Sequence, residues 1–419
     1  MRLTPHAGRL TTYAAAALVS GALMGRPEVT AFGVAAVAVL AWKAWPRTPS
    51  VSAELTVEEE RVVEGEPVPL RVRLVADAAV DRATVRVALD ASLDVVGGDR
   101  SATVSLRPGE TRDVVVTIRP RRWGVYKAGA SVVAYARGGL VTESYALPVE
   151  TLRVMPRAEE FTAGAPHPYT RALTGAHTAR VSGEGIEPMG VREYRPGDAL
   201  RRVNWRVTAR RGDLHVTEQV PERNAEVVLF LDTYVDRGPH GATTLDTAVR
   251  AAAGIADHYL SSMDRVGAVG FGGVLRWLYA DAGRVQRHRL LEHLIGTAAV
   301  ATYADKDVDV VPARALPPRA LVIALSPLLD SRAVDSLAHL AHRGYPMLVV
   351  DTSPRPILPA PRTWSRDLAQ RLWLVERDGL IHRLGELGVP VVPWAGTGTL
   401  DVVLAQVARL HARPRVSPR

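Results

Sequence analysis

The distribution of apolar positions begins with two runs that are almost continuously apolar, residues 10–25 and 29–45. Each run approaches the ~20 residues that a membrane-spanning helix needs, and basic residues flank the pair at both outer ends. The pattern therefore predicts a transmembrane helical hairpin over residues 1–48, as in a multi-pass protein of the cell membrane, with the body of the chain in the cytoplasm. The alternative is a signal peptide with its apolar core at 13–24, although no clean cleavage site follows that segment.

The next stretch, residues 49–155, alternates between apolar and polar positions. In segments such as 69–75, 83–89 and 113–119, apolar residues recur at every second position. Turn sequences that contain Gly, Pro and Glu separate these segments. A period of two is typical of strands that bury one face. Roughly seven or eight such strands in about a hundred residues predict an immunoglobulin-like β-sandwich.

From residue 226 to 415, short apolar runs alternate with longer amphipathic stretches. Strands are predicted at 227–232, 266–271, 274–279, 319–325, 346–351 and 389–394, and helices at 245–263, 284–298, 330–343, 364–387 and 400–411. Strands that alternate with helices predict an α/β domain with a mostly parallel sheet covered on both faces. The strand at 274–279 follows its predecessor so closely that we expect it to be an antiparallel hairpin partner.

Between these two domains, residues 156–225 combine a linker rich in Pro, Gly, Thr and His with a dense cluster of charged and aromatic residues. The cluster contains Arg192, Tyr194, Gly197, Asp198, Arg201, Trp205, Thr208 and Arg210. The sequence from Pro196 to Asp198 is typical of a turn, and arginine side chains pair bidentately with carboxylates. We therefore expect Asp198 to hold Arg192, Arg201 or Arg210 in a partly buried network, with Tyr194 and a buried Trp205 as aromatic platforms.

Charge and composition narrow the possible functions. The chain has 52 Lys and Arg against 44 Asp and Glu, a net charge of +8, but no basic helix or aromatic-interleaved strand that would indicate a nucleic-acid partner. It has no Cys, which excludes disulfides, thiol nucleophiles and thiolate metal sites. The G-x-S-x-G, H-E-x-x-H and P-loop motifs are missing, so we predict no catalytic residues.

The cluster around Asp198 resembles the signature of a bacterial family called domain of unknown function fifty-eight, R-x-Y-x-x-G-D-x-x-R-x-I-x-W-x-x-[ST]-A-R followed by a strand ending in Asp. The chain matches it at Arg192, Tyr194, Gly197, Asp198, Arg201, Trp205, Thr208, Ala209 and Arg210, and carries Asn204 where Asp is usual. The flanking layout agrees over the whole chain. The resemblance implies a von Willebrand factor A-like sheet domain and a partnership with MoxR-type AAA+ ATPases.

A von Willebrand factor A domain typically binds a divalent ion through D-x-S-x-S after its first strand. Here those positions are Asp232, Tyr234 and Asp236, and the strand ends further along the sheet contribute Ser326 and Asp330. Hard cations need several oxygen ligands in a near-octahedral arrangement, and Tyr234 replaces one hydroxyl ligand. We therefore expect no cofactor, or at most Mg²⁺ at a degenerate site. The other interpretation is that these acids cap helices and form turns.

The predicted protein is multidomain, with a transmembrane hairpin, a β-sandwich and a von Willebrand factor A-like domain. We expect it to be a membrane-anchored, non-enzymatic adaptor or assembly protein that works with a MoxR-type ATPase in chaperone-like or cell-envelope processes. The alternative is an enzyme that acts on an anionic envelope substrate through Asp198 and its neighbouring arginines.

Overall fold

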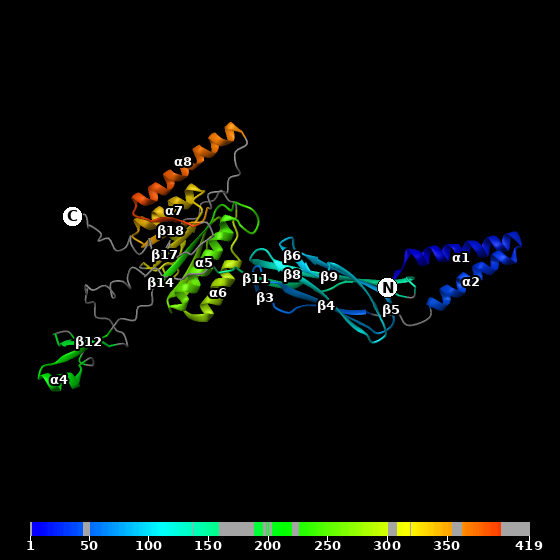
Figure 1. The fold of residues 1–419 in the computed structure, drawn as a ribbon, viewed down its shortest axis with the longest axis horizontal. Coiled ribbons are helices and arrows are strands. Elements are labelled where there is room, and N and C mark those ends of the chain that lie inside the picture. The colour runs from blue at the N-terminus through cyan, green and yellow to red at the C-terminus, as the bar shows by residue number, and fades with distance from the viewer. Residues whose placement is uncertain are drawn as a thin grey trace. The chain divides into compact units, whose positions relative to one another are not determined.

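The computed structural model describes residues 2–44, 51–136, 138–158, 188–195, 198, 200, 203–219, 226–300, 308–318, 320–353 and 363–394. The chain divides into two compact units, residues 1–157 and 158–419 (Figure 1). His167 and His177 of the linker and the predicted helix at 400–411 lie outside the described residues.

The first unit begins with two packed helices, α1 (Pro5–Met24) and α2 (Pro27–Ala44). Glycines allow their close approach, because a Cβ added to Gly21 would lie 2.5 Å from Thr30 Oγ1, and one added to Gly33 would lie 2.7 Å from Leu18 Cγ. Gly25 ends α1 in the left-handed conformation, with φ of 64°. The sequence thus forms a helical hairpin in which small residues set the spacing.

The predicted transmembrane nature of this hairpin is wrong. Within the described part of the chain, no helix combines the length and the apolar character that a membrane span requires. The first turns of α1 carry His6 and Arg9, and α2 starts at Pro27 and Glu28, so the apolar part of each helix is shorter than ~20 residues. The cytoplasmic placement of residues 50–419 depended on those two spans and stays a prediction.

Strands dominate the rest of the first unit, as a β-sandwich requires. They are β1 (Arg2–Leu3), β2 (Val51–Val57), β3 (Arg61–Val63), β4 (Val68–Ala76), β5 (Val80–Leu89), β6 (Leu93–Gly97), β7 (Ser101–Leu106), β8 (Thr111–Pro120), β9 (Gly124–Ala136), β10 (Val141–Ala146) and β11 (Glu150–Met155). A four-stranded sheet has the order β2-β4-β8-β6, and the remaining strands form a seven-stranded sheet around β9. Apolar residues of both sheets share one buried cluster.

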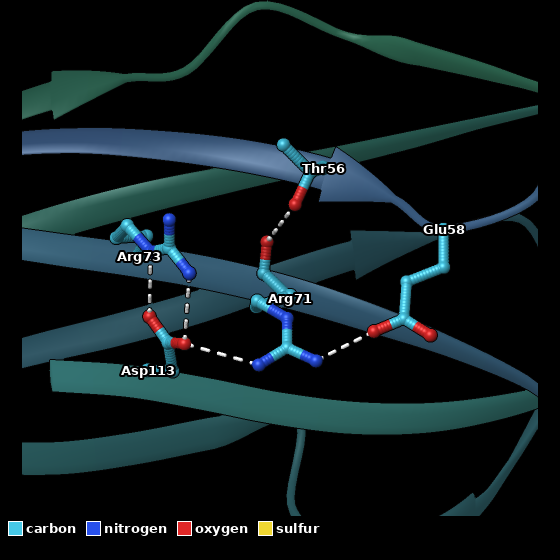
Figure 2. A network of polar contacts seen from close by, with 5 residues as sticks. All are labelled: Thr56, Glu58, Arg71, Arg73 and Asp113. Carbon is cyan, nitrogen blue, oxygen red and sulfur yellow. Dashed lines mark hydrogen bonds and ion pairs between the residues drawn. The ribbon is translucent and has the colours of Figure 1, made fainter.

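Strand β4 shows how the alternating pattern builds this layer. Leu70, Val72 and Leu74 are fully buried in the core, whereas Arg71 and Arg73 lie on the outer face of the sheet. Both arginines donate to the Asp113 carboxylate of β8, at 3.0 Å from Arg71 Nη1 and 3.1 Å from Arg73 Nε (Figure 2). The two guanidinium groups lower the pKa of Asp113. Opposite charges on adjacent strands thus allow a strongly polar outer face to accompany a dry inner one.

The second unit contains a six-stranded sheet with the order β16-β15-β14-β17-β18-β19. Its strands are β14 (Glu226–Thr233), β15 (Arg265–Gly272), β16 (Arg276–Asp281), β17 (Leu321–Ser326), β18 (Met347–Asp351) and β19 (Val391–Pro393). All neighbouring pairs are parallel except β15 with β16, which is antiparallel. The expected mostly parallel sheet with one hairpin strand is therefore confirmed.

Helices cover both faces of this sheet: α5 (Thr244–Ser261), α6 (Gly283–Ile295), α7 (Ser331–His342) and α8 (Trp364–Glu386). A short 3-10 helix spans Val308–Val310. Residues of α7 and of the C-terminal part of α8 share a buried cluster with Phe230 and Val349 of the sheet. Helices α5 and α6 pack on the other face (Figure 1). This arrangement leaves the carboxyl ends of the parallel strands as the place where loops gather.

A small additional structure replaces part of the predicted linker. Strands β12 (Pro188–Glu193) and β13 (His215–Gln219) form an antiparallel pair, and the short helix α4 (Trp205–Arg211) lies between them in sequence. We call the described residues between 188 and 219 the signature module. Gly197 and Arg201 lie outside the described residues.

Candidate functional site

The frame of the signature module is built from polar contacts between α4 and β13. Asn204 caps the helix, its Oδ1 accepting from Val207 N at 3.2 Å, while its Nδ2 donates to Thr217 Oγ1 at 3.2 Å. On the next turn, Thr208 Oγ1 accepts from His215 N at 3.0 Å. These side-chain bonds fasten a helix of only two turns, which has little stability in isolation.

Asp198 forms the polar contacts on the β12 side of the module. Its two carboxylate oxygens accept from Arg192 Nη1 and Nη2, each at 2.7 Å, and Arg195 N donates to the same carboxylate at 2.7 Å. The side chains of Arg192 and Asp198 are 21% and 20% exposed. The bidentate Arg192 guanidinium, followed by the Arg195 amide, lowers the pKa of Asp198 to about 2. Asp198 therefore stays ionised and fixes the turn to β12.

The other described residues of the predicted cluster differ in their exposure to solvent. Arg210 is exposed on the last turn of α4, and Tyr194 is half-buried. The expectation that Trp205 buries its ring is wrong, because its side chain is 67% exposed. The buried residues among those described in the module are Val203, His215 and Val216, and they offer too small an apolar core to receive an indole ring.

A second group of polar residues lies at the carboxyl edge of the six-stranded sheet. Ser326 is paired in register with Asp351, and Asp232 occupies the same row because its preceding residue pairs with the one before Ser326. Ser326 Oγ donates to Asp232 Oδ2 at 2.6 Å, and Tyr234 N donates to Asp232 Oδ1 at 2.9 Å. Burial outweighs these two bonds and raises the pKa of Asp232 to about 6.

The third member of this row, Asp351, is held by an arginine from α8. Arg377 Nη2 donates to Asp351 Oδ1 at 2.5 Å and to the Pro327 carbonyl at 3.2 Å, and the Arg377 and Asp351 side chains are 10% and 7% exposed. This pair was not predicted from the sequence. The available signal was that Arg377 shares its helical face with Leu380 and Leu384, so a charge falls on the core side of α8.

The remaining metal candidates already bind protein groups. Asp236 Oδ1 accepts from Leu245 N at 3.1 Å and from Thr244 Oγ1 at 3.2 Å, at the start of α5. Asp330 caps α7 and pairs with Arg332, whose Nη2 lies 2.7 Å from Asp330 Oδ2. The Arg332 guanidinium lowers the pKa of Asp330.

The Arg332 guanidinium also lies 4.6 Å from the centre of the Tyr234 ring. The donor set therefore does not fit a Mg²⁺ ion, because Arg332 already neutralises one acid and the other two acids serve as a helix cap and a buried hydrogen-bond acceptor. Among the residues with described positions, no cluster of His, Cys, Asp or Glu side chains has the arrangement of a metal site.

Comparisons with known proteins agree with the resemblance over part of the chain. Residues 190–354, from the signature module to just past β18, match the family described as Protein of unknown function DUF58. Two curated relatives, Uncharacterized protein Rv1480 of Mycobacterium tuberculosis and Uncharacterized protein Mb1516 of Mycobacterium bovis, are each 35% identical over 122 residues. The matched segment is 28% of this chain and 38% of each relative.

Similarity to solved structures is weak. The CARDB domain of a Pyrococcus furiosus protein is 17% identical, with a TM-score of 0.21, over 26% of this chain and 97% of that domain. The C-terminal part of alpha-2-macroglobulin from Escherichia coli is 18% identical, with a TM-score of 0.24, over 38% of this chain and 22% of that structure. TM-scores this low support no conclusion about function.

Proposed function

We propose that the protein is a non-enzymatic adaptor whose second unit binds another protein. The six-stranded sheet, with its antiparallel β16 at one edge, supports a von Willebrand factor A-like domain, since its strands follow the 3-2-1-4-5-6 order of doubly wound sheets. Folds of this class host many activities, so the proposal depends on the sites and not on the fold.

The observation that carries the proposal is that the candidate acidic side chains are bound to other groups of the protein. Both oxygens of Asp198 bind Arg192, and a pKa of about 2 makes this carboxylate a poor acid or base at neutral pH. Asp232, Ser326 and Asp351 bind protein groups at the carboxyl edge of the sheet. These contacts argue against the enzyme alternative, which needs an acid that is available to a substrate.

The resemblance to the family suggests a MoxR-type AAA+ ATPase as the partner. To test this, the purified full-length chain is immobilised and a MoxR-type ATPase from the same bacterium is passed over it with ATP, with ADP or without nucleotide. We expect saturable binding in at least one nucleotide state. Absence of binding in all three states contradicts the partnership, and turnover of an anionic substrate by the isolated chain contradicts the adaptor role.

A further inference from the structure

We infer that the outer surface of α4, formed by Trp205, Arg206, Ala209 and Arg210, is a docking surface for an acidic protein segment that carries an apolar side chain. All four residues are exposed. Trp205 and Ala209 are four residues apart, as are Arg206 and Arg210, so an apolar stripe and a basic stripe run next to each other on the helix. The inference rests on the proposed function, because it names the surface through which the adaptor binds a partner.

Exposure alone does not identify such a surface, and helix α8 supplies the comparison. Trp364 on α8 is 80% exposed, more than Trp205. On α8, however, four arginines are matched by four acidic residues along the helix, and Arg371 pairs with Asp367 at 2.9 Å. Helix α4 contains no acidic residue, and within the described residues neither Arg206 nor Arg210 forms an ion pair. Tryptophan beside unneutralised arginine is typical of residues that dominate binding energy at interfaces.

The module also holds this surface in a fixed geometry before binding. The helix is capped by Asn204, which also bonds to Thr217 on β13, and Thr208 accepts from a β13 amide. The turn that precedes the helix is closed by Asp198 with Arg192. A surface that is already ordered loses less conformational entropy when a partner binds, which raises affinity for a given contact area.

The charge pattern favours an acidic protein over a second copy of this chain or a nucleic acid. A second copy carries the same excess of basic residues, since the net charge of the chain is +8. A nucleic-acid backbone requires a longer basic track, and the module also exposes the carboxylates of Glu193 and Asp213. A short acidic segment with one apolar side chain matches two arginines and one indole ring.

The test places a photo-crosslinking amino acid at Ala209 of the full-length protein in the cells that produce it. Position 209 lies on the proposed surface but leaves Trp205 and both arginines intact. Crosslinked peptides are identified by mass spectrometry, with and without Arg206→Glu. We expect crosslinks to a protein segment with more acidic than basic residues, and a reduction of about tenfold with Arg206→Glu. The matched control is Arg366→Glu on α8, which should leave the yield unchanged.

Several outcomes overturn the inference. The inference is wrong if the crosslinks go to nucleic acid, to a second copy or another part of this chain, or to a segment without excess acidic residues. It is also wrong if Arg206→Glu leaves the crosslink yield unchanged, or if no crosslink forms. Thermal unfolding of each variant verifies that the module still folds. If the chain binds the ATPase but position 209 gives no crosslink, the docking surface is wrong and the adaptor role stands. If the crosslink forms but no ATPase binds, the surface stands and the proposed partner is wrong.

Discussion

The carboxyl edge of the sheet and the signature module use the same chemical groups in opposite ways. At the sheet edge, Asp351 and Arg377 are about nine-tenths buried and bind each other, and Asp232 is buried with Ser326 as its donor. In the module, one ion pair closes a turn, while Arg206 and Arg210 face outward beside an exposed indole ring. The polar groups at the sheet edge are buried and bind one another. In the module, polar groups hold the strands and the helix together, and the outer surface of α4 stays exposed to solvent.

Burial and hydrogen bonding determine which of these polar groups can bind a partner. Removing a buried, fully hydrogen-bonded polar group lowers the free energy of unfolding, because its partner is left without a hydrogen bond in a low-dielectric environment. An exposed arginine without an ion pair has no such constraint and is available to a partner.

The largest effect is expected for Arg377→Met in α8. The change removes the guanidinium from Asp351, whose side chain is 7% exposed in the wild type, and from the Pro327 carbonyl. Breaking a buried pair by removing one partner costs about 3–5 kcal/mol of unfolding free energy. Urea unfolding of the full-length protein measures this loss. If Arg377→Met costs as little as a surface change, the interior role of this pair is refuted.

The control for this experiment lies on the same helix. Arg383 pairs with Asp335 at 2.9 Å, but both side chains are more than half exposed, at 55% and 57%. Solvent screens such a pair, so Arg383→Ala should cost under about 1 kcal/mol. Each variant removes one arginine from α8, so the difference between their losses of unfolding free energy reports the effect of burial and not the effect of charge.

The second effect is a pH dependence that belongs to Asp232. Its pKa is raised to about 6 by burial, while an unfolded Asp has a pKa of about 3.9. The folded state therefore binds the proton more tightly. The contribution of Asp232 to stability is fully present below about pH 4 and is lost as pH rises through about 6, with a total of about 3 kcal/mol.

The variant Asp232→Asn removes this titration and keeps an acceptor for Tyr234 N. Wild type and variant are unfolded in urea at pH 4, 5, 6 and 7, and the difference between their unfolding free energies is followed. We expect the variant to gain stability relative to wild type as pH rises. Asp330→Asn is the control, because the Arg332 guanidinium lowers the pKa of Asp330 and places its titration below this pH range, so its difference from wild type should stay nearly constant from pH 4 to 7. A difference that is constant with pH contradicts the raised pKa.

These cases also show what the sequence makes predictable. The strand predicted at 227–232 is β14, at Glu226–Thr233, and the helix predicted at 330–343 is α7, at Ser331–His342. Such elements follow from continuous apolar runs and from helical periodicity, which are local properties of the chain. For the Arg377–Asp351 pair, helical periodicity could place Arg377 on the core side of α8, but no local pattern could identify Asp351 as its partner.

The errors in the sequence analysis have related physical causes. Apolar composition predicted the helices α1 and α2, but whether they span a membrane depends on the polar residues within them, and they do not qualify. Around Asp198, residue type predicted a pair with Arg192, Arg201 or Arg210, and Arg192 is a partner in the structure. It did not predict the β12–β13 pair or the exposure of Trp205, because β12 and β13 have too little apolar periodicity to indicate strands and the module has almost no core.

The smallest effect on overall stability is expected for Asp198→Asn, because its contacts stay within the module. Asp198 binds Arg192 and the Arg195 amide, and its pKa of about 2 lies below that of an unfolded Asp. Its contribution is therefore present above about pH 3.9 and is lost as pH falls toward about 2. At neutral pH the variant lacks the charge that holds Arg192, so the turn and β12 should open more often.

Hydrogen exchange measured by mass spectrometry tests this locally. In Asp198→Asn we expect faster exchange in the peptides of β12 and β13 and unchanged exchange in β14 and β17, since the sheet has its own buried core. Asp213→Asn is the control, because it changes an exposed acid of the same module. If exchange is unchanged in Asp198→Asn while partner binding or turnover is abolished, then Asp198 belongs to a functional surface and its structural role is refuted. If both exchange and binding change, the frame that Asp198 and Arg192 close also positions the outer surface of α4.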